Sequence, residues 1–413
     1  MGLPQVYGSS DPKYALTLVV VTILALFYCF QWLKPQPFRL VNGRKFGELT
    51  NVRAKKEFMF GARQLIAKGL ALAPGFPFRV IGDVGEILIL PPKYAHEIRN
   101  HDHLSFTQAA FKWFYAHLPG FEGFREGTTE SHIMKLVARN QLTHQLKLVT
   151  EPVSDECSSV LDSIYTNNAA RRGERFECND AIDWLEQTAQ DKKLTYDPAC
   201  AQLSLSVAAL HSTTDFFTQV MLDIACNPEL VEPLRKEIIS VLGVAGWSKH
   251  SLYQLKLMDS VLKESQRLKP IAIASMRRMT TENIKLADGT VLPKNTLTLV
   301  SAHKHWDAGS YEEPHRFDGY RFYNLRQVPG KENVSQLVSV SPDHMGFGYG
   351  LHACPGRFFA SEEIKLVLCH ILLKYDFRLV EGTDIEPRKF GLNMNANPAA
   401  KLAVRRRKEE IIL

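Results

Sequence analysis

Residues Phe347 to Gly356 read FGYGLHACPG, and this stretch decides the fold. Glycines at positions 346, 348 and 350 let the backbone turn tightly and approach a flat ligand closely. Cys354 stands just before the expected start of a helix, where the N–H groups and the helix dipole favour a thiolate. Two other interpretations are a buried core cysteine beside a glycine turn and a dinucleotide-binding loop. The dinucleotide loop is disfavoured because the G-x-G-x-x-G spacing and a following βαβ unit are both missing.

A thiolate held on a glycine loop against a flat ring is what axial ligation of heme iron requires. FGYGLHACPGRFFA closely resembles the heme-binding signature of the cytochromes P450, F-x-x-G-x-[HR]-x-C-x-G, and further motifs follow in the family's order. The resemblance implies a mainly α fold with small β-sheets (α+β) and a b-type heme, iron protoporphyrin IX. It also implies that Cys354 is the axial ligand of the iron and that Phe347 and His352 belong to the heme site.

Glu264 and Arg267 match the family's E-x-x-R motif, well before Cys354 in the chain. Three positions apart on a helix, their charges face each other. Alone, such a pair is usually an ordinary surface ion pair of little energetic weight. The resemblance implies a buried structural pair that steadies the cysteine loop, with Arg321 of FDGYRF (317–322) as its third member. The segment PHRF (314–317) is a competing match for that third member.

A long helix is predicted from 198 to 226, because Asp197 can cap its start and Pro198 suits its first turn. Its apolar sequence is interrupted by His211, Ser212 and Thr213. Such polar residues often face solvent, with hydroxyls bonded back to the helix. The resemblance instead places His211 at the acid position and Ser212 at the first Thr of the family's A-G-x-[DE]-T-T, where the helix kinks for O₂. Ser212 or Thr213, with His211, is then expected to deliver protons.

Cations for the heme propionates are the next expectation from the resemblance. Arg278 fits the family's Arg in the strand after the Glu264 helix, and His352 takes a position that is usually Arg. In the predicted helix 131–146 the family has W-x-x-x-R; this chain has no Trp there, and Lys135 and Arg139 are both candidates. Each of these residues alone is more often a surface charge.

The resemblance implies a monooxygenase that inserts one oxygen atom of O₂ into an apolar substrate, with residues 271–275 and 391–396 facing that substrate. The sequence carries no flavin or nicotinamide fingerprint, so electrons are expected from a separate NADPH–cytochrome P450 reductase. The chain resembles fungal members that make secondary metabolites, which suggests a terpenoid or polycyclic natural product. The formal net charge of +6 is spread along the chain, and no nucleic acid is expected as a partner.

Residues 14–33 are uncharged and, at about 1.5 Å per residue in a helix, long enough to cross the bilayer core. The run is too long for a signal peptide. Lys and Arg follow it closely, while Lys13 stands alone before it. The positive-inside rule then predicts a single-pass anchor with the body of the protein in the cytosol. The resemblance implies that the membrane is that of the endoplasmic reticulum. The predicted organisation is a lumenal 1–13, a transmembrane helix 14–33, a linker 34–60 and a heme domain 61–413.

Arg139 and Ser212 lie much closer together in the sequence than the family resemblance leads us to expect. The missing part is expected between residues 140 and 200, around 165–178, where the family has distal helices over its substrate pocket. Without these helices water reaches the site. The alternative hypothesis is therefore a truncated, catalytically inactive, membrane-anchored heme-binding or scaffold protein.

The remaining composition and periodicity exclude disordered, collagenous and coiled-coil chains, because 45% of the residues are hydrophobic and 23% charged. Seven scattered cysteines do not form a disulfide framework. The pattern predicts a hairpin at 76–90, an aromatic loop at 104–128, a helix at 251–268, strands at 276–300 around the Asp288-Gly289 turn, and a buried helix after Arg357. Asn227 is expected to cap the helix that follows it.

Overall fold

A computed structural model of the chain describes residues 16–23, 37–129, 132–142, 146–166 and 181–411. The chain forms two units, Met1–Arg39 and Leu40–Leu413. In the first unit residues 16–23 are helical. Within the described residues no helix is both long and apolar enough to cross a membrane. The rest of the predicted span 14–33 lies outside the described residues.

The unit Leu40–Leu413 begins inside the predicted linker. Asn42 is buried, and its side-chain amide donates hydrogen bonds to the carbonyl oxygens of Ala54 and Ile81 at 3.0 and 2.9 Å. The first helix of the unit, α2 (Val52–Leu72), buries Phe58 in the core. Residues 40–60 are therefore part of the folded unit, because they bury apolar and amide groups that a solvated linker would expose.

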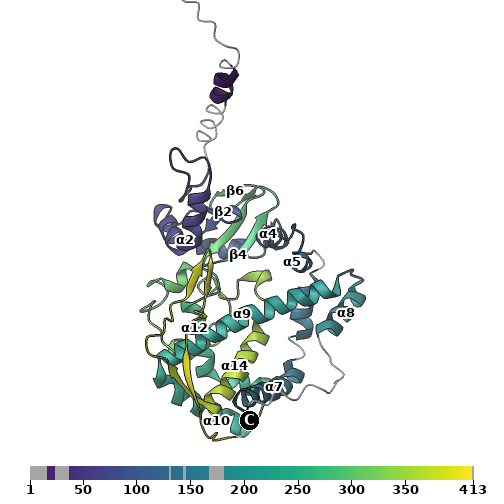
Figure 1. Cartoon of the computed structure of the whole chain (residues 1–413), viewed down its shortest axis with the longest axis vertical. Helices are drawn as coiled ribbons and strands as arrows, with labels where there is room; N and C mark the ends of the chain where they lie inside the picture. Colours follow the sequence, from purple (N-terminus) through teal and green to yellow (C-terminus); the bar gives the residue numbers. More distant parts are fainter. Residues whose placement is uncertain (1–15, 24–36, 130–131, 143–145, 167–180, 412–413) are drawn as a thin grey trace, which may run out of the picture. The chain divides into compact units, whose positions relative to one another are not determined.

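Most of the regular secondary structure in this unit is helical (Figure 1). The further α-helices are α3 (Ala95–Ile98), α4 (Phe106–Trp113), α5 (Glu122–Glu126), α6 (Ile133–Leu136), α7 (Leu146–Thr166), α8 (Ala181–Lys192), α9 (Pro198–Cys226), α10 (Val231–Ala245), α11 (Lys249–Gln254), α12 (Lys256–Leu268), α13 (Arg321–Arg326) and α14 (Arg357–Lys374). Short helical segments are η1 (Pro92–Tyr94), η2 (Val137–Leu142), η3 (Pro228–Leu230), η4 (His303–Trp306) and η5 (Gly350–His352). The expectation of a mainly helical fold with small sheets is confirmed.

The largest sheet has five strands in the order β1-β2-β7-β4-β3, and only the β2–β7 pair is parallel. The strands are β1 (Phe78–Gly82), β2 (Gly85–Leu90), β3 (Leu104–Ser105), β4 (Ala274–Thr280), β5 (Ile284–Lys285), β6 (Val291–Leu292), β7 (Leu297–Ser301), β8 (Tyr375–Leu379), β9 (Arg388–Phe390), β10 (Asn393–Asn395) and β11 (Leu402–Arg406). β1 and β2 form the predicted hairpin, and β4 to β7 the predicted strands. Gly289 has a φ of +84°, as the predicted turn requires.

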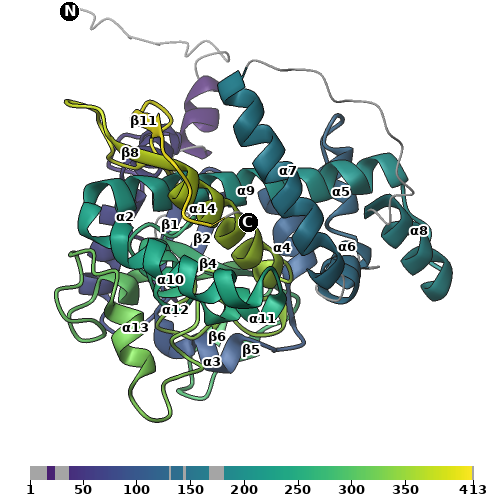
Figure 2. The same ribbon diagram turned by 90° about the horizontal axis from the view of Figure 1, so that it is seen from below.

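The helix α9 has the predicted bounds. Asp197 accepts a hydrogen bond from the N–H of Cys200 at 2.9 Å, which caps the start of the helix. α12 and α14 both pack against α9 (Figure 1). α14 is the predicted buried helix after the cysteine loop, and Figure 2 shows α7 lying along it. Their contact includes a hydrogen bond of 2.8 Å between Ser154 Oγ and His370 Nε2.

In the first half of the chain one predicted element was wrong, and one predicted helix differs in its form. The stretch 104–128 contains helices α4 and α5, because Ser105 Oγ accepts a hydrogen bond from the N–H of Gln108 and caps α4. The predicted helix 131–146 is helical from Ile133 to Leu142 as α6 followed by the π-helical η2, and α7 is described from Leu146 on; residues 143–145 lie outside the described residues.

Two further predictions in the second half were wrong. The helix 251–268 is broken at Leu255, whose ψ of 72° is not helical. Glu237 accepts hydrogen bonds from the N–H groups of Leu257 and Met258, and these bonds begin α12 as a separate helix. Asn227 does not cap η3, because its side-chain amide donates to the carbonyl oxygen of Asp223 instead.

The contact between α2 and the sheet gives a first prediction. A Cβ atom at Gly69 would lie 2.1 Å from the ring of buried Phe78, so the helix reaches the strand only without a side chain there. Gly69→Ala should destabilise the protein by about 1–3 kcal/mol through overpacking, measured by chemical denaturation. Gly61→Ala in the same helix is the control, because its Cβ would meet no atom closer than 3.8 Å. Equal effects of the two substitutions would contradict the prediction.

Candidate functional site

The cysteine loop leads into α14, which begins at Arg357. The N–H of Cys354 donates to the carbonyl oxygen of Phe347 at 2.8 Å and closes the loop. Gly348 and Gly350 have φ angles of +75° and +82°, which glycine adopts without strain. At Gly350 a Cβ atom would also lie 2.7 Å from the carbonyl oxygen of Arg99, just after α3. The loop geometry therefore requires the glycines that the sequence places there.

Cys354 lies where two effects on its thiol oppose each other. Burial raises the pKa of Cys354, while the N–H groups of Gly356 and Arg357 and the Arg357 charge lower this pKa. The Arg357 guanidinium donates to the Cys354 carbonyl oxygen at 2.8 Å. N–H donors directed at a largely buried sulfur suit a thiolate that binds a metal ion.

Four predicted propionate ligands lie in one cluster. Arg278 in β4 is 2% exposed, and its burial lowers its pKa to about 10. Its Nη1 donates to the carbonyl oxygen of Arg277 at 2.6 Å, whereas its buried Nη2 has no hydrogen-bond partner in the described part of the chain. Burial lowers the pKa of Lys135, and the charges of Arg139 and Arg278 lower this pKa further.

His352 is the fourth member of this cluster, beside the cations. Its pKa is lowered to about 4 by burial and by the charges of Arg278 and Lys135, so the ring is neutral near pH 7. The ring stacks on Phe106 of α4 with a centroid distance of 5.2 Å. Phe106 belongs to the aromatic stretch of the sequence but was not predicted as a site residue, since the stacking joins segments that are far apart in the chain.

These residues fit a heme. Arg278 has a buried guanidinium nitrogen without a hydrogen-bond partner in the described part of the chain. No carboxylate is among the groups that shift the pKa values of Arg278 and Lys135. Such a site is suited to binding the two carboxylates of a heme. The buried Cys354 sulfur with its N–H donors is suited to an iron ligand. Phe347, the remaining predicted heme contact, packs against the largest hydrophobic cluster, and its carbonyl oxygen holds Cys354.

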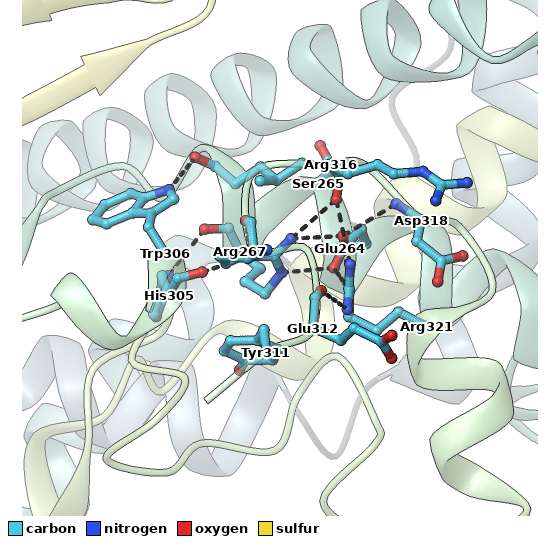
Figure 3. Close-up of polar contacts among 12 residues, drawn as sticks. Glu264, Ser265, Arg267, His305, Trp306, Tyr311, Glu312, Arg316, Asp318 and Arg321 are labelled. Atoms are coloured by element: carbon cyan, nitrogen blue, oxygen red, sulfur yellow. Dashed lines mark hydrogen bonds and ion pairs between the residues drawn. The ribbon is translucent and has the colours of Figure 1, made fainter. Parts of the chain in front are cut away.

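A buried carboxylate joins two arginines behind the cysteine loop (Figure 3). Glu264 and Arg267 are both 0% exposed, and two hydrogen bonds of 2.7 Å link their side chains. Arg321 Nε lies 3.1 Å from both oxygens of Glu264. The guanidinium of Arg316, from the competing PHRF segment, instead pairs with Glu313 at the surface. The structure thus brings together the three residues that the sequence analysis grouped.

His305 connects this pair to the cysteine loop. Its Nδ1 lies 3.1 Å from the carbonyl oxygen of Arg267, and its Nε2 lies 3.0 Å from the N–H of Met345. The Nε2 atom therefore accepts, and the ring is the neutral tautomer with the proton on Nδ1. Burial lowers the pKa of His305 to about 3. The sequence analysis missed His305, because no local pattern links it to the distant Met345.

Gln266 makes a second connection to the same loop. Its Oε1 lies 3.0 Å from Nε2 of the buried His344, whose ring stacks on His305. A Cβ atom at Gly346 would lie 2.1 Å from the Gln266 side chain, so these segments touch directly. Gln266 stands inside the E-x-x-R motif, which is the one sequence signal that could have pointed to it.

The predicted proton-delivering residues lie together on α9. His211 is exposed, and Ser212 and Thr213 are half-buried. Ser212 Oγ donates to the carbonyl oxygen of Ala208 at 2.9 Å. α9 is helical throughout Pro198–Cys226, so the kink expected from the resemblance is not observed at this hydroxyl. The bond back to the helix satisfies the Ser212 hydroxyl locally.

Comparison with known proteins settles the family. The family profile described as Cytochrome P450 matches residues 134–403. Cytochrome P450 monooxygenase 1 of Gibberella fujikuroi is 58% identical over 440 residues, covering 83% of this chain and 100% of that protein. This chain is a cytochrome P450. Cytochrome P450 monooxygenase hepE of Aspergillus oryzae is 39% identical over 496 residues, with 96% of this chain and 90% of that P450 covered. The resemblance seen in the sequence is confirmed, and the relatives are monooxygenases.

This cytochrome P450 is shorter than its relatives. Cytochrome P450 monooxygenase esdpI of Penicillium shearii is 39% identical over 505 residues, covering 98% of each chain. Since this chain has 413 residues, many of those aligned positions have no counterpart in it. The predicted place of the difference, around 165–178, falls almost entirely on residues 167–180, which lie outside the described residues. That place stays a prediction.

Substitution of the buried carboxylate should be costly. Glu264→Gln leaves two guanidinium groups without their charged partner, and we expect a loss of about 3–5 kcal/mol in the free energy of unfolding, measured by denaturant titration. Arg316→Ala removes the exposed pair with Glu313 and is the control, with no measurable change in melting temperature expected. A Glu264→Gln protein as stable as the wild type would show that the pair is not structural.

Buried His305 predicts an acid-sensitive stability. Its folded pKa of about 3 lies below the ordinary value of 6.5, so between these pH values the unfolded state binds a proton that the folded state does not. Stability contributed by neutral His305 is therefore complete above pH 6.5 and decreases as the pH falls. Compared with His305→Gln, the wild type should lose about 1.4 kcal/mol more per pH unit below about pH 6. Parallel pH profiles of the two proteins would contradict this assignment.

Proposed function

We propose that this cytochrome P450 inserts one oxygen atom of O₂ into an apolar natural product, a terpenoid or polycyclic secondary metabolite. The family and the fungal monooxygenases among its relatives support the reaction class. The observation that carries the proposal is that Cys354, with N–H donors at its sulfur, follows two residues after His352, which lies among the charges of Arg278 and Lys135. We propose b-type heme as the cofactor, because its two carboxylates match the cluster and its iron matches the sulfur.

Each part of the site has a distinct task when heme is bound. The heme supplies the reductive activation of O₂ at its iron. Cys354 would hold the cofactor through its sulfur, at which Gly356 and Arg357 direct N–H groups that favour the anionic form. Arg278 and its neighbouring cations would bind the propionates and offset their charge.

Protons are proposed to arrive from α9. Ser212 and Thr213 are half-buried hydroxyls, and exposed His211 stands beside them at the solvent boundary. Its exposed ring is in contact with the water that would supply the protons. For Ser212 to pass a proton on, its hydroxyl must rotate away from the Ala208 carbonyl oxygen, whereas no such bond ties the Thr213 hydroxyl among the described contacts.

The location and electron source follow from the sequence. The uncharged stretch 14–33, followed by Lys and Arg residues, supports a single-pass anchor in the endoplasmic reticulum membrane with the heme domain in the cytosol. NADPH–cytochrome P450 reductase is proposed as the redox partner, because the chain carries no flavin or nicotinamide motif of its own. Its docking is expected on the basic surface near the cysteine loop.

A second candidate function is a heme-binding or scaffold protein without turnover. It is favoured by the aligned positions that a full-length relative has and this shorter chain lacks. Leu210, next to His211, is 66% exposed, and Leu203 on the same helix is 58% exposed. Exposed large apolar residues beside the predicted proton path indicate that few other residues cover this part of α9. Water would then reach a site from which a monooxygenase must exclude it.

The spectrum of the reduced, carbon monoxide-bound protein tests the thiolate ligand. The full chain supplied with hemin should show the family's long-wavelength band, and Cys354→Ala should abolish it because the sulfur is lost. Cys226→Ala removes an exposed free cysteine and is the control, with the band unchanged. A band that survives in Cys354→Ala would overturn the ligand assignment.

Turnover then separates the two functions. With the reductase, NADPH consumption coupled to a product that carries one added oxygen atom supports the monooxygenase. The band without product or NADPH consumption, over a panel of terpenoid and polycyclic compounds, supports the second candidate.

A further inference from the structure

One carboxylate on α9 joins three segments that are far apart in the sequence. Asp215 stands one turn after His211, and its side chain is 8% exposed. Its Oδ2 forms an ion pair with Lys269, the residue that follows α12. Its Oδ1 accepts a hydrogen bond of 2.7 Å from the N–H of Ala396. Each oxygen of Asp215 is therefore used on a different segment.

The two segments that Asp215 binds are themselves joined and reach the cysteine loop. The N–H of Ile273 donates to the carbonyl oxygen of Leu392, and the N–H of Met394 donates to the carbonyl oxygen of Ile271, both at 2.9 Å. Shortly after Ile273, Ser275 Oγ would be 3.7 Å from a Cβ atom at Gly348. Residues 269–275 and 391–396 thus form one paired unit between α9 and the cysteine loop.

We propose that Asp215 is a positioning residue that sets how this paired unit faces α9, and hence which ligands fit beside Ser212 on the heme. The proposal rests on the proposed function, because it assigns residues 269–275 and 391–396 to the boundary of the same site. Asp215 contacts neither the cysteine nor the cationic cluster in the described structure, so its effect acts through the two segments.

The charge of Asp215 makes this junction specific. Lys269 is 3% exposed; its burial lowers its pKa, and the nearby carboxylate of Asp215 acts against that decrease. A buried ammonium group requires a charged partner at a fixed place, and a carboxylate with a second oxygen can hold a backbone N–H as well. A neutral side chain at position 215 would remove the ion pair of Lys269, leaving the charge of Asp223 to act on it without a direct contact, and would loosen the paired unit from α9.

Asp223 offers a matched control two turns further along α9. It is also buried, and it accepts hydrogen bonds from Ser265 of α12 at 2.6 Å and from Gln219 of its own helix at 2.9 Å. Its charge also raises the pKa of Lys269, but among the described contacts it forms no hydrogen bond to residues 269–275 or 391–396. A general loss of packing between α9 and α12 should therefore appear equally in Asp215 and Asp223 variants, while a positioning effect should appear in Asp215 variants alone.

The experiment uses the heme-loaded full chain and two iron-binding probes, imidazole and the larger 4-phenylimidazole, followed by spectral titration. In Asp215→Asn the ratio of the two dissociation constants should change by about fivefold or more, because the phenyl ring must fit beside the paired unit. The imidazole constant alone should stay within about twofold of the wild type, and Asp223→Asn should keep the wild-type ratio. An unchanged ratio in Asp215→Asn, or equal changes in both variants, would overturn the proposal.

Two further measurements keep the outcome decisive. If Asp215→Asn does not fold, Lys269→Met breaks the same ion pair and carries the same expected change in the ratio. In Asp215→Ala, which removes the acceptor, the amide of Ala396 should exchange hydrogen about tenfold faster, with wild-type exchange in Asp223→Asn. Hydrogen exchange is also measured on the protein without heme, so the two hypotheses can fail separately. Failure to bind heme would refute the proposed function. Unchanged exchange of the Ala396 amide in Asp215→Ala would refute the role of Asp215 in holding the paired unit.

Discussion

The buried carboxylate of Glu264 is the constraint on which the rest of the unit depends. It is removed from water and holds Arg267 and Arg321, and Arg267 in turn donates to carbonyl oxygens near α13 and η4. Such a charge is tolerable in the interior only when every oxygen and N–H finds a partner. Satisfying these groups fixes α12, η4 and α13 relative to one another, and through His305 it fixes the residues that begin the cysteine loop.

A second buried charge network on α12 supports the same region. Asp259 pairs with Arg326 at 2.7 Å and with Lys365 of α14 at 2.7 Å. Lys263 donates to three carbonyl oxygens of residues 334, 336 and 339, and burial lowers its pKa to about 7. The irregular chain between α13 and the cysteine loop is thus held by side chains of α12, because it has little regular backbone pairing of its own.

Local signals in the sequence predicted those parts whose causes are local. Asp197 and Pro198 gave the start of α9, and the glycine and cysteine pattern gave the loop before α14. The break at Leu255 was missed because Glu237, which lies on the separate helix α10, accepts the N–H groups that begin α12. His305 and Asp215 were missed for the same reason: their partners lie in distant parts of the chain, and no periodicity reports such contacts.

Two carboxylates on α9 also have a mechanical consequence. Asp215 and Asp223 stand two helical turns apart, and each binds a partner on α12 or directly after it. Sliding or rotating α9 against α12 would break at least one of these buried bonds, so the two contacts resist shear between the helices. We therefore expect the slow thermal fluctuations of this protein in the segments that surround these two helices.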